Sequence, residues 1–345
     1  MSAAPGEGAA RQEATAPGEG AAPDPRAAML DGLHPQVRDL LDSRAGAALH
    51  VHGPAALEAQ RAGYLQTALE LGGALEEVAS VEDVVIPRAG DGGRVPARAY
   101  RPQTCDDPAG CIVWAHGGGW CLGDVEGFDR VCRSLANAAC ANVLSVEYRL
   151  APEHRHPAGL DDVATAIAWA RGAGAEQLGF DPARVAAGGD SAGGNLVAVA
   201  VRRARGDGLA PLRAQLLVYP ATDAAGETGS YATFADGPML TAAEMRACWA
   251  TYLGDAADPA DPDVSPLRAA DLSGLPATLV IVAGHDPLVD DGAGYAKRLE
   301  EAGVDVTLAR YEDMVHGFLR WGGAVERAGE AVKQLAAFAR ERLAA

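Results

Sequence analysis

A serine stands between small residues in the string Gly189-Asp-Ser191-Ala-Gly193, which has the pattern Gly-x-Ser-x-Gly. A strand-like apolar run ends at Gly188 just before it, and a helix-like stretch, 194–205, follows it. A tight turn between a strand and a helix needs small neighbours, so that the backbone can hold the serine hydroxyl above the sheet. The pattern therefore predicts that Ser191 is a nucleophile.

Three consecutive glycines follow the apolar run 111–115, in His116-Gly-Gly-Gly-Trp120. Because glycine has no side chain, backbone N–H groups at this place can approach a substrate oxygen and stabilise negative charge on it. A phosphate-binding loop is the alternative interpretation. It is disfavoured because neither Lys-Ser/Thr nor the spacing Gly-x-Gly-x-x-Gly accompanies the glycines. We therefore expect an oxyanion hole in this loop.

A serine hydroxyl is a weak nucleophile at neutral pH and needs a base. His316 lies just after the last predicted strand, on the side of the sheet where it could reach Ser191. Asp286 directly follows another buried run, and a carboxylate there would orient the imidazole and stabilise its protonated form. Three other acids are rivals for this role: Asp290, Asp291 and Asp313.

Short apolar runs typical of buried parallel strands alternate with helical stretches along the chain. The predicted strands are 81–86, 95–100, 111–115, 143–146, 185–187, 216–219, 278–283 and 304–311. The predicted helices are 128–139, 160–171, 194–205, 241–253, 295–302 and 324–343. This order favours an α/β fold, with a mostly parallel sheet and helices on both of its faces.

The 345 residues are compatible with one domain and some added elements. Residues 1–28 are rich in Ala, Pro, Gly and Glu and contain no aromatic residue, so a disordered tail is predicted. Residues 29–345 are predicted to form a single domain. Within it, cap elements from about 29–75 and 221–262 are expected to cover the carboxyl ends of the strands, where such folds bind ligands.

The formal net charge is −18, which disfavours nucleic acids and anionic membranes as partners and favours a neutral small-molecule substrate. No apolar stretch reaches the roughly 20 residues that a membrane span needs, and no secretory signal is recognised. Six cysteines lack Cys-x-x-Cys spacing, so reduced thiols in a cytoplasmic protein are expected. His50 and His52 have no third ligand at metal-binding spacing, so no metal site is expected there.

Together these motifs resemble those of the bacterial hormone-sensitive lipase family of carboxylesterases, over about 79–345. The resemblance rests on the glycine loop and the serine turn described above and on four further strings: Glu147-Tyr-Arg-Leu-Ala-Pro-Glu-His154, Ser265-Pro-Leu267, Asp286-Pro-Leu288 and His316-Gly-Phe318. It implies an α/β-hydrolase fold with eight strands and a helical cap. Two departures concern the substrate pocket, since His285 and His156 replace residues that are more often aromatic or apolar in the family.

The resemblance also implies the role of each site residue. Ser191 would be the nucleophile, His316 the base and Asp286 the acid, because the family's acid precedes Pro-Leu. The amides of Gly118, Gly119 and Ala192 would form the oxyanion hole. The expected activity is hydrolysis of small neutral esters of short to medium acyl chains through an acyl-enzyme, without a metal or an organic cofactor.

Two other classes of function can use the same scaffold. One is a biosynthetic acyltransferase, lactonase or amidase that acts through the same triad. The other is a non-catalytic small-molecule receptor, which is disfavoured because such receptors typically lose the base, whereas His316 is present. The sequence leaves open the natural substrate and whether the chain forms a homodimer.

Overall fold

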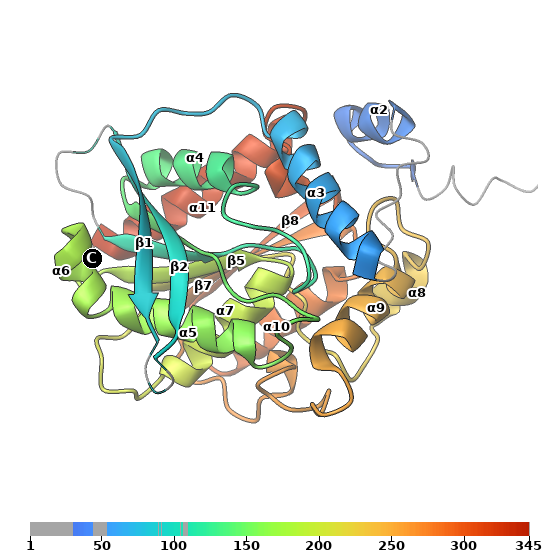
Figure 1. The fold of residues 1–345 in the computed structure, drawn as a ribbon. Helices are drawn as coiled ribbons and strands as arrows, with labels where there is room; N and C mark the ends of the chain where they lie inside the picture. Colours follow the sequence, from blue (N-terminus) through green and yellow to red (C-terminus); the bar gives the residue numbers. More distant parts are fainter. Residues whose placement is uncertain are drawn as a thin grey trace, which may run out of the picture.

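The computed structural model describes residues 30–43, 54–88, 90, 92–103, 105 and 110–344. In this part of the chain a central sheet of eight strands lies between two layers of helices (Figure 1). The expected α/β-hydrolase architecture is therefore confirmed. The predicted tail, 1–28, and the histidines at positions 50 and 52 lie outside the described residues.

All eight predicted strands are present, in the spatial order β1-β2-β4-β3-β5-β6-β7-β8. β2 is antiparallel to both of its neighbours, and the remaining pairs from β4 to β8 are parallel. Every residue of β3, β4 and β6 is buried, which explains their continuous apolar sequences. The strands are β1 Ser80–Pro87, β2 Arg94–Arg101, β3 Cys111–Ala115, β4 Asn142–Val146, β5 Val185–Asp190, β6 Ala214–Val218, β7 Ala277–His285 and β8 Val306–Val315.

Helices cover both faces of the sheet (Figure 1). On one face α4 (Asp129–Ala139) packs against α11 (Glu326–Ala344). On the other lie α5 (Ala158–Ala170), α7 (Ala192–Ala204) and α10 (Val289–Glu301), and a short helix, α6 (Ala173–Leu178), follows α5.

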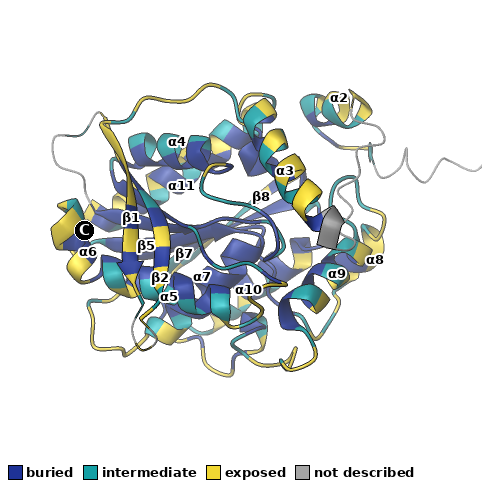
Figure 2. Cartoon of the chain, in the orientation of Figure 1, coloured by how far each residue is buried: buried dark blue, intermediate teal, exposed yellow. Residues whose placement is uncertain are grey.

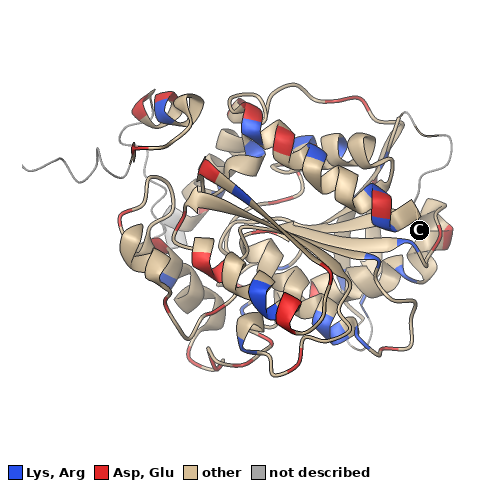
Figure 3. Cartoon of the chain, turned by 180° about the vertical axis from the view of Figure 1, so that it is seen from behind, with Lys and Arg blue, Asp and Glu red and all other residues tan. Residues whose placement is uncertain are grey.

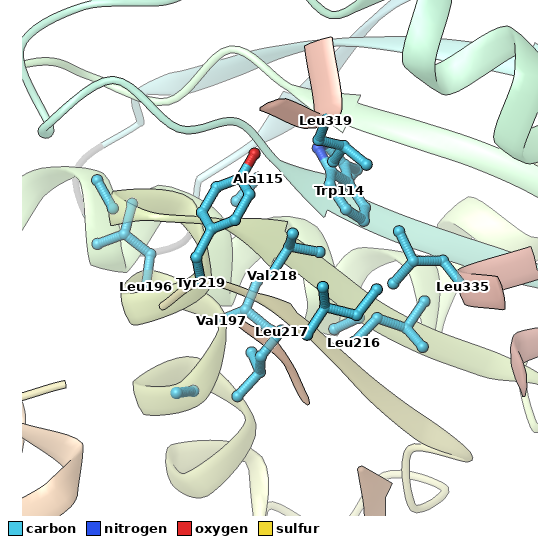
Figure 4. Packing of buried hydrophobic residues seen from close by; sticks show 14 of the residues in the cluster. Trp114, Ala115, Leu196, Val197, Leu216, Leu217, Val218, Tyr219, Leu319 and Leu335 are labelled. Atoms are coloured by element: carbon cyan, nitrogen blue, oxygen red, sulfur yellow. The ribbon is translucent and has the colours of Figure 1, made fainter. Parts of the chain in front are cut away.

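Large apolar side chains fill the space between the helices and the sheet. Leu216 on β6 is completely buried, with Leu335 of α11 on one side of the sheet and Val197 of α7 on the other (Figure 4). Trp114 of β3 is also completely buried and, with Leu216, flanks Gly188 of β5. Burial of each such side chain stabilises the fold by roughly 1.5–3 kcal/mol. The middle of the sheet is accordingly buried, while the edge strand β1 is largely exposed (Figure 2).

Further helices gather at the end of the sheet where the parallel strands finish (Figure 1). They are α2 Pro35–Ser43, α3 Pro54–Leu71, α8 Gly229–Thr233, α9 Ala242–Leu253 and the 3₁₀ turns η1 Pro266–Arg268 and η2 Phe318–Arg320. The helix α9 begins with a capping box, in which the Thr241 hydroxyl accepts a hydrogen bond from the Glu244 amide and the Glu244 carboxylate accepts one from the Thr241 amide.

One helix boundary differs from the sequence prediction. α10 begins at Val289 rather than near Tyr295, so Asp290 and Asp291 lie in its first turn. Gly292 and Gly294 weaken the helical pattern of this turn in the sequence, because glycine is a poor helix former. Acidic side chains nevertheless suit the first turn of a helix, where they face the positive end of the helix dipole.

The expectation that all six cysteines are reduced is wrong for one pair. Cys105, in the connection between β2 and β3, forms a disulfide with Cys140, the left-handed residue that ends α4. A separation of 35 residues gives no recognisable motif, so the sequence could not reveal this pair. The other four cysteines are free and buried: Cys111, Cys121, Cys132 and Cys248.

Acidic and basic side chains are interspersed over the helices and loops of the side shown in Figure 3. In this view neither sign of charge is concentrated in one helix or strand. Among the described helices, none combines the length and the apolar composition that crossing a membrane requires.

Candidate active site

Ser191 occupies the sharp turn between β5 and α7. Its backbone has φ +53° and ψ −119°, a conformation that is costly for a residue with a side chain. The turn is held by the Ser191 amide, which donates to the Val218 carbonyl at 2.8 Å. Glycine is required on both sides, because a Cβ at Gly189 or Gly193 would lie within 2.6 Å of the Ala115 carbonyl oxygen. The strand–turn–helix setting predicted for Ser191 is thus the one in the structure.

His316 and Asp286 come from the ends of β8 and β7 and meet Ser191 there. The His316 Nε2 atom lies 2.8 Å from Ser191 Oγ, and His316 Nδ1 lies 2.7 Å from Asp286 Oδ2. The other carboxylate oxygen of Asp286 accepts a hydrogen bond from the Leu288 amide at 2.9 Å. Asp286 is completely buried, whereas the His316 side chain keeps 12% of its surface exposed. The three predicted residues therefore form one hydrogen-bonded chain that ends at the Ser191 hydroxyl, in the wall of a cavity.

The rival acids are engaged elsewhere. Asp290 accepts a hydrogen bond from the Ser230 amide at 2.9 Å, and Asp291 accepts one from the Thr222 amide at 3.0 Å. Asp313 pairs with Arg327 at 3.1 Å. Burial raises the pKa of Asp291 to about 7, so this carboxyl group is held in an environment that disfavours its charge. The structure brings only Asp286 of the four acids into hydrogen-bonding contact with His316.

The glycine loop lies beside this chain. Gly118 and Gly119 line the same cavity as Ser191 and His316, and Ala192 is the first residue of α7. Both glycines have positive φ, +133° and +59°, which glycine adopts without strain. Within the described residues, neither of their amides donates a hydrogen bond to another group.

Two side chains that the sequence reasoning missed hold this loop in place. Asp190 Oδ1 accepts a hydrogen bond from the Gly117 amide at 2.8 Å. On the other side, the Tyr148 hydroxyl donates to the His116 carbonyl at 2.7 Å. Burial raises the pKa of Asp190 to about 6, although the nearby Arg320 guanidinium lowers it. Asp190 lies in the Gly-x-Ser-x-Gly motif and Tyr148 in the string that begins at Glu147, so their places in these motifs were the signal that could have identified them.

The imidazole of His116 has a structural rather than a proton-transfer environment. It is completely buried and stacks on the Tyr148 ring at a centroid distance of 4.3 Å. Burial lowers its pKa to about 4, so it is neutral at physiological pH. His156, one of the two departures from the family pattern, contacts the Tyr252 hydroxyl of α9 through Nδ1 at 3.1 Å. The other, His285, lies against Phe234 with ring centroids 5.7 Å apart.

The cavity in front of Ser191 is walled by elements from distant parts of the sequence. Tyr64 comes from α3, and Met245 and Cys248 come from α9. Polar groups are few, and Glu244 and Arg320 carry opposite charges. Among the described residues, no group of three or more His, Cys, Asp or Glu side chains is arranged to hold a metal ion. The further residues lining it are Leu122, Asp190, Met239, Leu240, Gly317 and Trp321.

The family model for the alpha/beta hydrolase fold matches residues 112–320, which hold the glycine loop, the serine turn, the acid and the base. This chain belongs to the α/β-hydrolase family. The resemblance to its hormone-sensitive lipase branch is likewise confirmed.

Relatives with related names cover most of this hydrolase. It is 43% identical over 266 residues to the carboxylic ester hydrolase LipN of Mycobacterium tuberculosis. This alignment covers 74% of this chain and 70% of the relative. It is 37% identical to the ethyl acetate hydrolase of Pseudomonas putida, over 83% of this chain and 90% of the relative. The hyperthermophilic esterase of Pyrobaculum calidifontis superposes with a TM-score of 0.83 at 37% identity, covering 91% of this chain and 99% of that one.

Proposed function

We propose that this α/β-hydrolase is a serine carboxylesterase that acts on small, neutral carboxylic esters. The observation that carries the proposal is the hydrogen-bonded chain from Asp286 through His316 to Ser191. This chain ends in a cavity that Gly118 and Gly119 also line, so a nucleophile, a base and backbone donors face one substrate carbonyl. The relatives' names, carboxylic ester hydrolase and ethyl acetate hydrolase, support the same class of reaction.

The first half of the reaction forms an acyl-enzyme. His316 Nε2 takes the proton of the Ser191 hydroxyl as Oγ attacks the ester carbonyl carbon. The carbonyl oxygen becomes an oxyanion and accepts hydrogen bonds from the Gly118, Gly119 and Ala192 amides. Each such donor lowers the barrier by about 3–4 kcal/mol in comparable sites. When the tetrahedral intermediate collapses, His316 gives the proton to the departing alkoxide and an alcohol leaves.

The second half releases the acid. A water molecule gives a proton to His316 and attacks the acyl carbon, and the same backbone donors stabilise the second oxyanion. His316 then returns the proton to Ser191 Oγ as the carboxylic acid departs. In both halves the buried Asp286 carboxylate keeps the Nδ1–H tautomer of His316 and stabilises the imidazolium.

The cavity wall supports a preference for short to medium acyl chains. Met239, Leu240 and Met245 give it an apolar lining on the cap side, which suits a hydrocarbon chain. We propose that α3 and α9 act as the cap of the single domain and restrict the chain to about four to eight carbons. The net charge of −18 opposes docking on an anionic lipid surface, so the substrate is expected as a dissolved monomer.

The Cys105–Cys140 disulfide bears on the cellular compartment in which the protein works. Disulfides persist in oxidising compartments and are rare in the cytosol. The cytoplasmic localisation expected from the sequence therefore requires that Cys105 and Cys140 are reduced in the cell. Counting free thiols in protein isolated under alkylating conditions distinguishes the two states.

The proposed function is tested by removing one oxygen atom. Ser191→Ala is expected to abolish hydrolysis of p-nitrophenyl butyrate. The thermal midpoint should stay close to that of the wild type, because within the described part of the chain the hydroxyl forms a hydrogen bond with His316 alone. Intact mass after brief exposure to an organophosphonate should show one adduct on the wild type. An adduct that persists on Ser191→Ala would assign the nucleophile elsewhere. Product analysis with an added alcohol separates hydrolysis from acyl transfer.

A further inference from the structure

The guanidinium of Arg61, on the cap helix α3, contacts two loops at the catalytic edge of the sheet. Its Nε donates to the Cys121 carbonyl at 2.9 Å, and its Nη2 donates to the Ala151 carbonyl at 3.2 Å. Nη1 and Nη2 also donate to the two carboxylate oxygens of Glu153, each at 2.8 Å. These are four hydrogen bonds from one planar guanidinium, whereas a lysine ammonium has three donors on a single nitrogen. Arg61 precedes the 112–320 segment that the family model matches.

Cys121 belongs to the turn that closes the glycine loop. The amides of Cys121 and Leu122 both donate to the Gly118 carbonyl, at 3.1 and 2.9 Å. The C=O of Gly118 and the N–H of Gly119 belong to one planar peptide unit and point in opposite directions. The bonds to the Gly118 carbonyl therefore fix the direction of the Gly119 N–H.

The turn at Trp120 has a strained backbone and depends on contacts with neighbouring segments. Trp120 has φ +60°, which is a strained conformation for a bulky side chain and persists only where the surroundings hold it. Its carbonyl accepts a hydrogen bond from the Ala151 amide at 2.9 Å, and the next carbonyl in the chain, that of Cys121, accepts the bond from Arg61. Arg61 thus contacts the strained turn and the segment that supports it.

The segment that contains Ala151 also contacts the start of the glycine loop, at His116. Tyr148, three residues before Ala151, donates its hydroxyl hydrogen to the His116 carbonyl. One turn further along α3, Tyr64 lines the cavity and lies under the Arg320 guanidinium, 3.6 Å from the ring centroid. The same side of α3 therefore touches the supports of the oxyanion loop and the wall of the cavity.

We propose that Arg61 is a positioning residue for the oxyanion hole, which it aligns from the cap through the Cys121 carbonyl and the Ala151–Glu153 segment. The inference rests on the proposed function, in which the Gly119 N–H stabilises the oxyanion. Arg61 does not touch the substrate. It acts by keeping the Gly118–Gly119 peptide unit in the orientation that the transition state needs.

The test compares Arg61→Ala and Arg61→Lys with Arg38→Ala, a matched control on α2 whose guanidinium bonds to the Leu30 carbonyl instead. With p-nitrophenyl butyrate, we expect Arg61→Ala to lower kcat by about 10- to 100-fold and to change KM by less than about twofold. Affinity for a trifluoromethyl ketone, which forms a tetrahedral oxyanion on Ser191, should fall by a similar factor. Arg61→Lys should fall between the wild type and Arg61→Ala, and Arg38→Ala should match the wild type.

The thermal midpoint of each variant is measured in parallel. If Arg61→Ala does not fold, the same kinetic comparison is made with Arg61→Lys alone. A lower midpoint with unchanged kcat and unchanged inhibitor affinity would reject the positioning role, and so would a higher KM at unchanged kcat. His316→Asn is measured beside them. If it is inactive while the Arg61 variants behave as the wild type, only this inference fails. If it remains active, the proposed catalytic site itself is wrong.

Discussion

The catalytic residues and the cap helix α3 face the same cavity but are held in different ways. Ser191, Asp286 and His316 each directly follow a strand of the parallel sheet, whose backbone ladder fixes where they stand. α3 contacts the site through the side chains of Arg61 and Tyr64, and the Arg61 side chain keeps 32% of its surface exposed. A side-chain attachment of this kind tolerates change better than a buried backbone ladder. The comparison predicts large losses of kcat at the strand ends and smaller or more selective effects in the cap.

After the loss of the nucleophile itself, the largest expected effect is at the acid, where Asp286→Asn should lower kcat by about 10⁴-fold. An amide cannot hold the Nδ1–H tautomer of His316 or stabilise its protonated form. The structure should change little, because the substitution preserves shape and leaves the oxygen that accepts from the Leu288 amide. Steady-state kinetics with p-nitrophenyl butyrate and a thermal melt of the same sample give both quantities.

Asp290→Asn is the matched control for this substitution, four residues further along the chain. Its carboxylate accepts a hydrogen bond from the Ser230 amide and does not contact His316. An asparagine oxygen can accept the same bond, so kcat should stay within about threefold of the wild type. If Asp290→Asn were the inactive variant, the acid would be misassigned and the strand-end argument would lose its main support.

The same contrast explains what the sequence could and could not predict. The strands and the residues at their ends carry local signals: continuous apolar runs, a glycine-flanked serine and an aspartate before Pro-Leu. The role of Arg61 has no such signal, because its partners, Cys121, Ala151 and Glu153, become neighbours only when α3 crosses the sheet edge. The choice of Asp286 over its rivals likewise needed either family resemblance or coordinates, since periodicity does not tell where a carboxylate points.

A smaller and more selective effect is expected from Met245→Ala in the cap helix α9. Met245 is buried and lines the cavity, so the shorter side chain leaves room for a longer acyl group. Binding of one or two additional methylene groups changes kcat/KM by roughly 10-fold or more. We therefore expect the ratio of kcat/KM for octanoate to that for butyrate to rise about 10-fold. Thr251→Ala, on the same helix and outside the cavity lining, should leave the ratio unchanged.

An unchanged ratio in Met245→Ala would mean that the acyl chain lies elsewhere and that α9 does not limit its length. A fall in kcat for both esters, without a change in their ratio, would place the cap among the elements that align the reacting groups. Either result would weaken the contrast between the strand ends, where substitutions should lower kcat, and the cap, where they should change substrate preference. The wild type should also hydrolyse butyrate and octanoate esters faster than palmitate, without activation at an emulsion interface.

The smallest expected effect comes from the charge of the whole molecule rather than from either region. The net charge of −18 should make a hemisuccinate ester a poorer substrate than the uncharged butyrate, by a few-fold at about 10 mM salt, where charges interact over about 30 Å. At about 0.5 M salt the difference should shrink, because screening reduces that range to a few ångströms. The cavity wall itself carries two acidic side chains, Asp190 and Glu244, and one basic side chain, Arg320, so it offers a hemisuccinate carboxylate no net positive charge. If hemisuccinate were instead preferred at low salt and salt removed the preference, Arg320 would dominate substrate choice.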